Sequence, residues 1–249
     1  MNPSEISGIG LDLGSTVAKF VAVKKGRIAR TAARPSHEIH LLVKENVPRA
    51  RKDVFTTGYF RRSVKSLRAI TEITAAKHAV AQLFPQDGVQ VILDIGGQDT
   101  KVVDLRTNQF LLNDKCSAGT GAFLEFAADY FGVRVEDLGR LHARSKRPVT
   151  INNTCGVFAI SEMISHMVSG AKKEDVIAGM HLAFAKRMAN MLPPDAKRIA
   201  LIGGGARNLG MVNALKGLLG RRTMLLIPKE PQFVNAYGAV AFGALSPRK

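Results

Sequence analysis

The chain has 249 residues, of which 46% are hydrophobic and 22% charged, as is ordinary for a globular protein with one large core or two small ones. No apolar run approaches the ~20 residues of a membrane helix, and the first residues lack the basic and apolar regions of a signal peptide. With only two cysteines in the sequence, a disulfide scaffold is not expected. We therefore expect a protein of the reducing cytoplasm that does not associate with membranes.

The formal net charge of +16 is the unusual feature of the composition. Residues 24–68 hold thirteen Lys or Arg and three Asp or Glu, so much of the positive charge is concentrated in one stretch. The simplest interpretation is a basic face exposed to solvent, and the alternative is a surface that binds an acidic protein. Nucleic acid is not expected as a partner, because the stretch carries no recognition motif beyond its charge.

The first elements in chain order are three predicted strands, at 6–13, 18–23 and 27–33, which together form a meander. The first strand runs into the turn Asp12-Leu13-Gly14-Ser15-Thr16. A glycine there lets backbone N–H groups approach a phosphate, and the two hydroxyls can add hydrogen bonds. Asp12 would hold a metal ion through water. The turn is not a Walker loop, because no Gly-Lys-Ser/Thr follows it.

The same layout returns at residues 89–105, where a buried strand ends in Asp94-Ile95-Gly96-Gly97 and is followed by a second strand. A third strand is predicted at 109–112. Asp94 lies 82 residues after Asp12, and the repetition predicts an internal duplication. In such a duplication, two similar turns can face each other across a cleft and bind the phosphates of one nucleotide from both sides.

Further elements are predicted by periodicity and by turn residues: an amphipathic segment at 37–47, strands at 53–57, 198–202 and 223–227, and helices at 71–84, 209–218 and 233–245. Residues 86–88 are expected to form a boundary between two lobes. The triple glycine at 203–205 can lie against a flat adenosine, because a Cβ atom would intrude there. A flexible turn between strand and helix is the alternative. The last helix is rich in Ala and Gly, which permits close packing.

Both cysteines precede apolar helical runs, which begin after Cys116 and after Cys155. A helix N-terminus favours a thiolate or an anionic cluster, and Lys115 adds a positive charge beside Cys116. The alternatives are two small buried side chains, a disulfide, or a redox thiol. Two cysteines cannot complete a four-thiolate site in one chain. Two chains related by a two-fold axis can complete it, for zinc or for a [4Fe–4S] cluster.

The ordered set of motifs DxGST, DIGGQDTK, GGGARN and AYGAVA resembles the actin/Hsp70/sugar-kinase superfamily (ASKHA). This resemblance implies an α/β fold of two ribonuclease-H-like lobes that bind Mg-ATP between them. Lobe I would comprise about 1–86 plus 236–249, and lobe II about 87–235, as a single ATPase unit over 1–249.

A narrower resemblance rests on the sequences NDKCSAGTGAFLE at 113–125 and NTCGVFAISE at 153–162. They are similar to the BadF/BadG/BcrA/BcrD ATPase family, which includes activators of 2-hydroxyacyl-CoA dehydratases and subunits of benzoyl-CoA reductase. Three positions depart from the family pattern: Ala122 where Arg is expected, Ile160 where Glu is common, and Phe60 where Gly often follows Gly-Tyr.

The resemblance implies an ATPase that reduces a partner protein. Cys116 and Cys155 of two chains would hold one [4Fe–4S] cluster, in a homodimer or a pseudo-symmetric heterodimer. Reduced ferredoxin or flavodoxin would donate the electron, and an iron–sulfur dehydratase or reductase would accept it. Asp12 and Asp94 would position Mg²⁺, and Gln98 would orient the attacking water. The residues expected to contact ATP are Gly14, Ser15, Thr16, Lys19, Gly96, Gly97, Asp99, Gly203, Gly204, Gly205 and Ala206.

Two other functions are consistent with the same motifs. A small-molecule kinase of the superfamily would have incidental cysteines, and it would be colourless and free of iron. An ATP-binding adaptor would bind a partner through its basic face and turn over little ATP.

Overall fold

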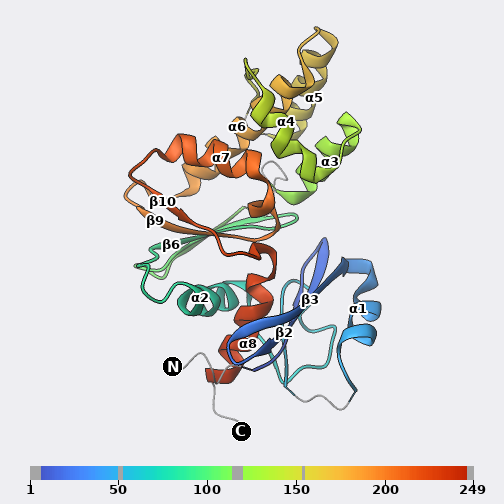
Figure 1. The fold of residues 1–249 in the computed structure, drawn as a ribbon, viewed down its shortest axis with the longest axis vertical. Coiled ribbons are helices and arrows are strands. Elements are labelled where there is room, and N and C mark those ends of the chain that lie inside the picture. The colour runs from blue at the N-terminus through green and yellow to red at the C-terminus, as the bar shows by residue number, and fades with distance from the viewer. Residues whose placement is uncertain (1–6, 50–52, 114–119, 153–154, 246–249) are drawn as a thin grey trace. The chain divides into compact units, whose positions relative to one another are not determined.

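Two mixed sheets of five strands form the framework of the computed structural model, which describes residues 7–49, 53–113, 120–152 and 155–245 (Figure 1). Each sheet belongs to a separate compact unit. Unit 1 comprises residues 1–89 and 228–249, and unit 2 comprises residues 90–227.

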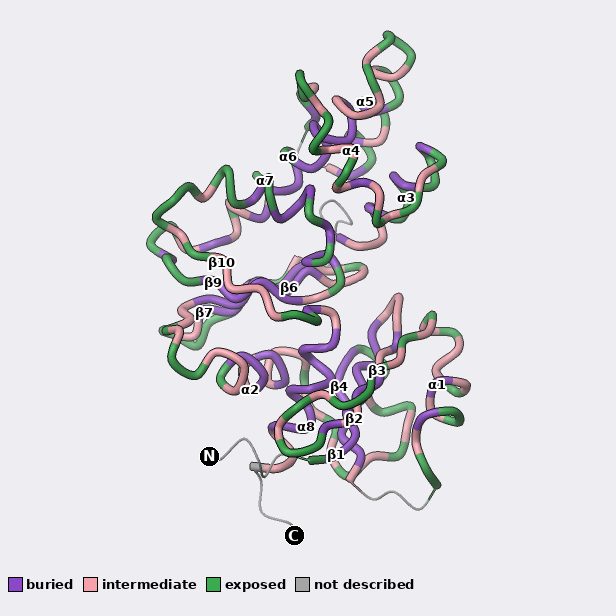
Figure 2. Tube along the Cα trace, in the orientation of Figure 1, coloured by how far each residue is buried: buried purple, intermediate pink, exposed green. Residues whose placement is uncertain are grey.

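The sheet of unit 1 has the strand order β3-β2-β1-β4-β5. The first three strands are antiparallel neighbours, as predicted, and β4 and β5 continue the sheet in parallel on the other side of β1. Every residue of β1 is buried (Figure 2), which its apolar sequence GIGLDL explains for all but Asp12. The strand bounds are β1 Gly8–Leu13, β2 Val17–Lys24, β3 Arg27–Pro35, β4 Val54–Thr57 and β5 Arg68–Ala69.

The described residues of unit 1 form the α-helices α1 Ile39–Asn46, α2 Glu72–Leu83 and α8 Val234–Leu245. Thr71 caps α2, because its hydroxyl accepts a hydrogen bond from the Thr74 N–H at 3.2 Å. Helix α8 packs against β1 and α2 (Figure 1). Its small residues permit this, since a Cβ atom on Gly238 would come within 1.9 Å of the Ala75 carbonyl oxygen. The close packing predicted for this helix is thus found inside unit 1.

The sheet of unit 2 has the order β10-β9-β6-β7-β8, which is the topology of unit 1 again. Its first three strands form an antiparallel meander, and β9 and β10 add in parallel beside β6. The predicted internal duplication is therefore confirmed at the level of strand order and direction. The bounds are β6 Val91–Ile95, β7 Thr100–Asp104, β8 Phe110–Asn113, β9 Arg198–Ile202 and β10 Met224–Leu226.

In the part of unit 2 that the structure describes, α3 to α7 are the α-helices, and α6 packs against α4, α5 and α7. The core of the unit joins apolar residues of β6 and β9 with those of α3, α6 and α7. The helical runs predicted after both cysteines are confirmed as α3 and α5, while Cys116 itself lies outside the described residues. None of the described helices is long and apolar enough to cross a membrane. The bounds are α3 Gly121–Phe131, α4 Leu138–Arg144, α5 Gly156–Val168, α6 Lys173–Met191 and α7 Leu209–Leu219.

Candidate functional site

Asp12 is a buried carboxylate near the end of β1, with an exposed fraction of 2%. Lys19 lies opposite it on β2 and donates a hydrogen bond to Oδ2 at 3.0 Å. The other oxygen, Oδ1, is buried and has no partner among the described residues, and the same holds for the hydroxyls of Thr16 and Thr57. Thr57 is the register partner of Asp12 on β4. Buried polar atoms in proteins are normally satisfied, so this group of oxygens fits a hydrated cation or a phosphate.

Gly58 brings the backbone after β4 against Asp12. Its φ of +94° is costly for other residues, and a Cβ atom there would lie 2.5 Å from the Leu13 carbonyl carbon and 2.7 Å from Asp12 Oδ1. The Phe60 N–H then donates to the Leu13 carbonyl at 2.8 Å. Only glycine can therefore occupy position 58 without displacing the carboxylate.

Asp94 holds the equivalent place in unit 2, with an exposed fraction of 3%. Its register partners are Lys101 on β7 and Ile202 on β9. Gly203 follows β9 as Gly58 follows β4; its φ is +87°, and a Cβ atom there would lie 2.4 Å from Asp94 Oδ1. Lys101 binds both carboxylate oxygens of Asp99 at 2.7 Å.

Residues 96–99 form a tight turn, which the Gly96 N–H closes by donating to the Asp99 carbonyl at 2.8 Å. A Cβ atom on Gly96 would lie 2.3 Å from Asp99 Oδ1, so this glycine is required by close packing. Gln98 is exposed at the turn. A carboxamide can both donate and accept a hydrogen bond, as the orientation of a water molecule requires.

The 96–99 turn is attached to the N-terminus of α3. The Gly121 N–H donates to the Gly96 carbonyl at 3.0 Å, and the Ala122 N–H donates to the Gly97 carbonyl at 2.8 Å. First-turn N–H groups have no partner within their own helix, so these bonds satisfy two of them. The turn and the helix after the Cys116 segment are therefore joined directly.

The remaining predicted nucleotide residues lie at the ends of the same strands. Gly14 follows β1, and its carbonyl accepts a hydrogen bond from Ser36 Oγ at 2.7 Å, while Ser15 is half-buried in the same turn. A Cβ atom on Gly205 would lie 2.2 Å from Ile95 Cγ2, whereas Gly204 is exposed and has open space at that position. Ala206 is buried. Packing thus requires Gly203 and Gly205, but it does not explain Gly204.

Cys155 is the N-cap residue of α5 and is half-buried. The backbone N–H groups of Phe158 and Val157 stabilise its thiolate and lower the pKa of the thiol, and Arg187 lowers it further. The Arg187 guanidinium also donates to Asn113 Oδ1 at 3.3 Å. Asn113 ends β8, three residues before Cys116 in the sequence. A thiolate at a helix N-terminus beside a cation suits the ligation of a metal or an iron–sulfur cluster.

Sequence reasoning missed two residues of this arrangement, Gly58 and Arg187. The internal repeat contained a signal for Gly58, because this glycine and Gly203 both follow the strand paired in parallel with the aspartate-bearing strand. No comparable signal marks Arg187. Within the described parts of the chain, no three His, Cys, Asp or Glu side chains gather closely enough to hold a metal by themselves.

The sequence and the fold were compared with those of known proteins. The model of the BadF/BadG/BcrA/BcrD ATPase family matches residues 9–243. The (R)-2-hydroxyglutaryl-CoA dehydratase activating ATPase of Acidaminococcus fermentans is 36% identical, with 94% of this chain and 95% of that protein aligned. The activator of 2-hydroxyisocaproyl-CoA dehydratase from Clostridium difficile, solved with bound ADPNP, is 36% identical and has a TM-score of 0.83 over 96% of this chain and 94% of that one.

More distant structures share only the fold. A ROK family glucokinase from Streptomyces griseus, solved with glucose and AMPPNP, is 12% identical and has a TM-score of 0.54, over 95% of this chain and 98% of that one. The predicted actin/Hsp70/sugar-kinase fold is thereby confirmed.

Proposed function

Because this chain belongs to the BadF/BadG/BcrA/BcrD ATPase family, we propose that it is an ATP-hydrolysing iron–sulfur activator of an acyl-CoA dehydratase or reductase. In this proposal, ATP turnover drives one low-potential electron from the activator to its partner. The observation that carries the proposal is the pair of hydrogen bonds between the 96–99 turn and the first residues of α3. They connect a glycine turn suited to phosphate with the helix that follows Cys116.

The two aspartates are proposed to position Mg²⁺ through water, and the unpartnered Asp12 Oδ1 supports this role in unit 1. The ion would neutralise phosphate charge as the γ-phosphoryl group leaves. Gln98 would orient the attacking water. The other residues assigned to ATP are Gly14, Ser15, Thr16, Lys19, Gly96, Gly97, Asp99, Gly203, Gly204, Gly205 and Ala206.

Transmission from ATP to the cysteines is proposed to run through α3. A shift of the Gly96 and Gly97 carbonyls on phosphate binding would move the N–H groups of Gly121 and Ala122 with them. Thr120 precedes them as the fully buried N-cap residue of α3. Since this end of the helix follows Cys116 closely in the sequence, the cysteine segment would respond to the state of the nucleotide.

Cys116 and Cys155 are proposed as two of the four ligands of a [4Fe–4S] cluster, with the other two supplied by a second chain. The cluster would supply reversible one-electron chemistry at low potential. The exposed apolar side chains after Cys155 support a protein interface there, because Val157 and Phe158 are 72% and 63% exposed. A homodimer satisfies the ligand count, as does a heterodimer with a related subunit. Reduced ferredoxin or flavodoxin in the cytoplasm is the proposed donor.

Anaerobic reconstitution with iron and sulfide tests this function. We expect about two iron and two sulfide ions per chain in the wild type, because one four-iron cluster would serve two chains. The variants Cys116→Ser and Cys155→Ser should each lose most of the iron while still binding ATP. An iron-free wild type that transfers phosphate to a small molecule would instead support the kinase alternative.

A further inference from the structure

A large pocket lies wholly within unit 1, between α1 and the segment that follows β4. Its volume is about 1320 Å³. Helix α1 lines it with Ile39 and Val43, and the 60–67 segment lines it with Phe60, Val64 and Leu67. These residues give the pocket an apolar floor. We call it the basic groove, for the charges that surround this floor.

The charged and titratable residues that line the basic groove are all basic. Lys44, Arg49 and Lys65 are exposed lining residues, and His37 and His40 lie beside them. Among the described residues no ion pair involves any of the three Lys and Arg side chains. The groove thus accounts for part of the basic stretch at 24–68, which ATP binding does not explain.

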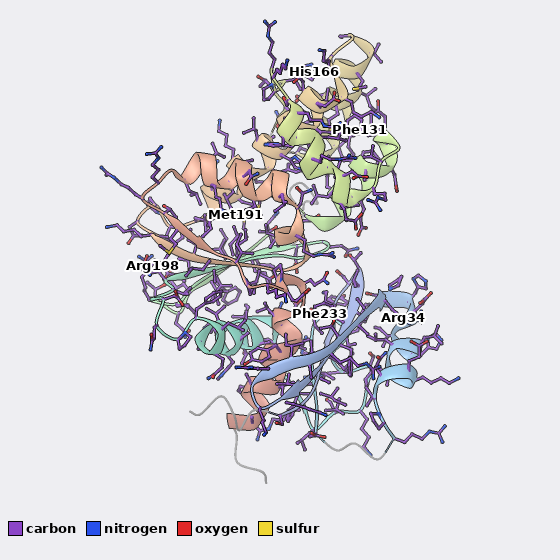
Figure 3. The ribbon with its side chains drawn as sticks, viewed as in Figure 1. Arg34, Phe131, His166, Met191, Arg198 and Phe233 are labelled. Atoms are coloured by element: carbon purple, nitrogen blue, oxygen red, sulfur yellow. The ribbon has the colours of Figure 1, made fainter. Side chains whose placement is uncertain are left out.

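Two acidic residues that lie next to lining residues in the sequence, Glu38 and Glu45, are paired with Arg34. Arg34 on β3 binds Glu38 at 2.7 Å and Glu45 at 2.8 Å, and it lies beside α1 (Figure 3). Both carboxylates are therefore held by a cation outside the groove, and Glu38 also lies 3.8 Å from Nε2 of the lining residue His37. None of the described residues that line the groove is acidic.

One edge of the groove carries large exposed apolar side chains. Tyr59 is 73% exposed, Phe60 40% and Leu67 57%. The rings of Tyr59 and Phe60 contact each other edge to face, with centroids 4.9 Å apart. Exposed aromatic residues beside an apolar pocket are typical of the centre of a protein–protein interface.

This edge is connected to the proposed nucleotide site of unit 1. Gly58 contacts Asp12, and two residues later the Phe60 N–H donates to the Leu13 carbonyl at 2.8 Å. The Thr56 hydroxyl on β4 contacts the 60–67 segment near both of its ends, through the Arg61 carbonyl at 2.8 Å and Ser66 Oγ at 2.9 Å. A molecule bound in the groove would therefore contact a segment that is anchored beside the Asp12 carboxylate.

We propose that the basic groove binds an acidic amphipathic segment of a partner protein. The apolar side chains of that segment lie on Val43, Phe60 and Val64, and its carboxylates face Lys44 and Lys65. A small anion is a poorer fit, because the cations are on exposed flexible side chains and no buried polar group converges on one point. This inference goes beyond the proposed function and depends neither on ATP nor on the cysteines.

Binding of a synthetic peptide tests the proposal. The probe is a fluorescein-labelled helical peptide of about fourteen residues, with Leu on one face and Glu on the other. We expect it to bind the purified protein with a Kd in the micromolar range that weakens with salt. A peptide with Gln in place of every Glu, measured by the same fluorescence anisotropy, should bind at least about tenfold more weakly.

Two matched variants localise the site. The pair Lys44→Glu with Lys65→Glu should raise the Kd about tenfold or more, whereas Lys24→Glu with Lys146→Glu, which change the net charge equally outside the groove, should raise it less than about threefold. Phe60→Ser should also weaken binding, and circular dichroism checks that each variant is folded. An equal rise of the peptide Kd in both double variants would show that binding depends only on net charge, and it would overturn the proposal. So would displacement of the peptide by acetyl-CoA, or an absence of binding at 100-fold excess of protein over probe.

Discussion

At the scale of single residues, the two units repeat one arrangement of three groups. Each has an aspartate near the end of its central strand, a lysine opposite it, and a glycine with positive φ pressed against the carboxylate. The glycine keeps the carboxylate close to the backbone, and in unit 1 Lys19 balances the charge of the buried Asp12. In unit 2, Lys101 binds the carboxylate of Asp99.

Gly58→Ala should destabilise the protein by more than its backbone conformation alone explains. Gly170 has a similar φ of +84° but nothing within 4 Å of its Cβ position, so Gly170→Ala measures the conformational cost, about 1 kcal/mol. Gly58→Ala has the additional cost of steric clashes with Leu13 and Asp12, and we expect it to lower the free energy of unfolding by about 3 kcal/mol in total. Urea unfolding followed by circular dichroism gives both values. Equal losses would show that the contact with Asp12 is not restrictive.

Gln98→Ala should slow ATP hydrolysis by about tenfold to a hundredfold and leave the Kd for ATP within about twofold of the wild type. The reason is that Gln98 is exposed at its turn and makes its proposed contribution to a water molecule rather than to the nucleotide. Steady-state phosphate release and calorimetric ATP binding measure the two quantities. A parallel loss of both would reject the assigned role.

Sequence reasoning predicted those site residues whose placement follows from local backbone chemistry. Asp12 and Asp94 lie near the ends of strongly apolar strands and Gly203 directly follows one, so the places of these residues in the fold could be predicted. Gly58 could not be identified directly, because its need for positive φ arises from contact with another strand. Arg187 could not be identified from the sequence either, because its partner Asn113 is 74 residues away along the chain.

At the scale of elements, α3 is hydrogen-bonded to the 96–99 turn and follows the Cys116 segment in the sequence. Gly121→Pro removes the N–H donor to Gly96, while Thr120 already has the extended conformation that precedes proline. We expect α3 to form and ATP to bind, but the response of the bound iron to ATP to fall at least about fivefold.

The measurement is the rate at which a chelator removes iron, with and without Mg-ATP. Glu72→Pro at the first residue of α2 is the control, because it tests a proline at the same helix position away from the 96–99 turn. An unchanged ATP response in Gly121→Pro would show that transmission takes another route.

Sequence analysis missed the helices α4 and α6 and the two-residue strand β5. Helix α6 has nineteen residues. Its buried residues, which include Gly179 and His181, lie on nearly all sides of the helix. A helix buried all round has no polar face, so the 3.6-residue pattern that reveals amphipathic helices is weak. The strands were easier to predict, because β1 and β6 are continuous apolar runs followed by glycine turns.

At the scale of the whole molecule, a buried histidine, His181, makes stability depend on pH. His181 is fully buried, its Nδ1 lies 3.3 Å from Nδ1 of His142, and burial lowers the pKa of His181 from its ordinary 6.5 to about 3. The unfolded chain then takes up a proton at higher pH than the folded chain does. Stability from this group is therefore complete above pH 6.5 and is lost as the pH falls toward 3.

We expect the wild type to be about 1.4 kcal/mol less stable at pH 5.5 than at pH 7.5 from His181 alone. In His181→Gln that pH-dependent difference should shrink by about the same amount, although the variant is less stable at both values. The exposed His40→Gln is the control. Urea unfolding at the two pH values measures the difference, and an unchanged difference in His181→Gln would contradict this origin.

The overall fold could be predicted from the sequence because its sequence motifs occur twice. Two aspartate turns, each with a following meander, predicted a duplicated α/β protein, and the two sheets have that topology. The concentration of basic residues in one stretch could also be read from the sequence. Their arrangement around an apolar groove could not be predicted, because Val43 and Phe60 are brought together only by the packing of α1 beside the sheet.

The most direct test of the central claim is whether ATP changes the environment of iron held by the cysteines. Anaerobically reconstituted protein is mixed with an iron chelator in the absence of nucleotide, with Mg-ADP and with Mg-ATP, and the absorbance of the iron chelate is followed over time. We expect a chromophore with about two iron ions per chain, and a chelation rate that Mg-ATP changes at least about fivefold while Mg-ADP changes it less. Equal rates under the three conditions, in protein that holds iron and hydrolyses ATP, would contradict the account.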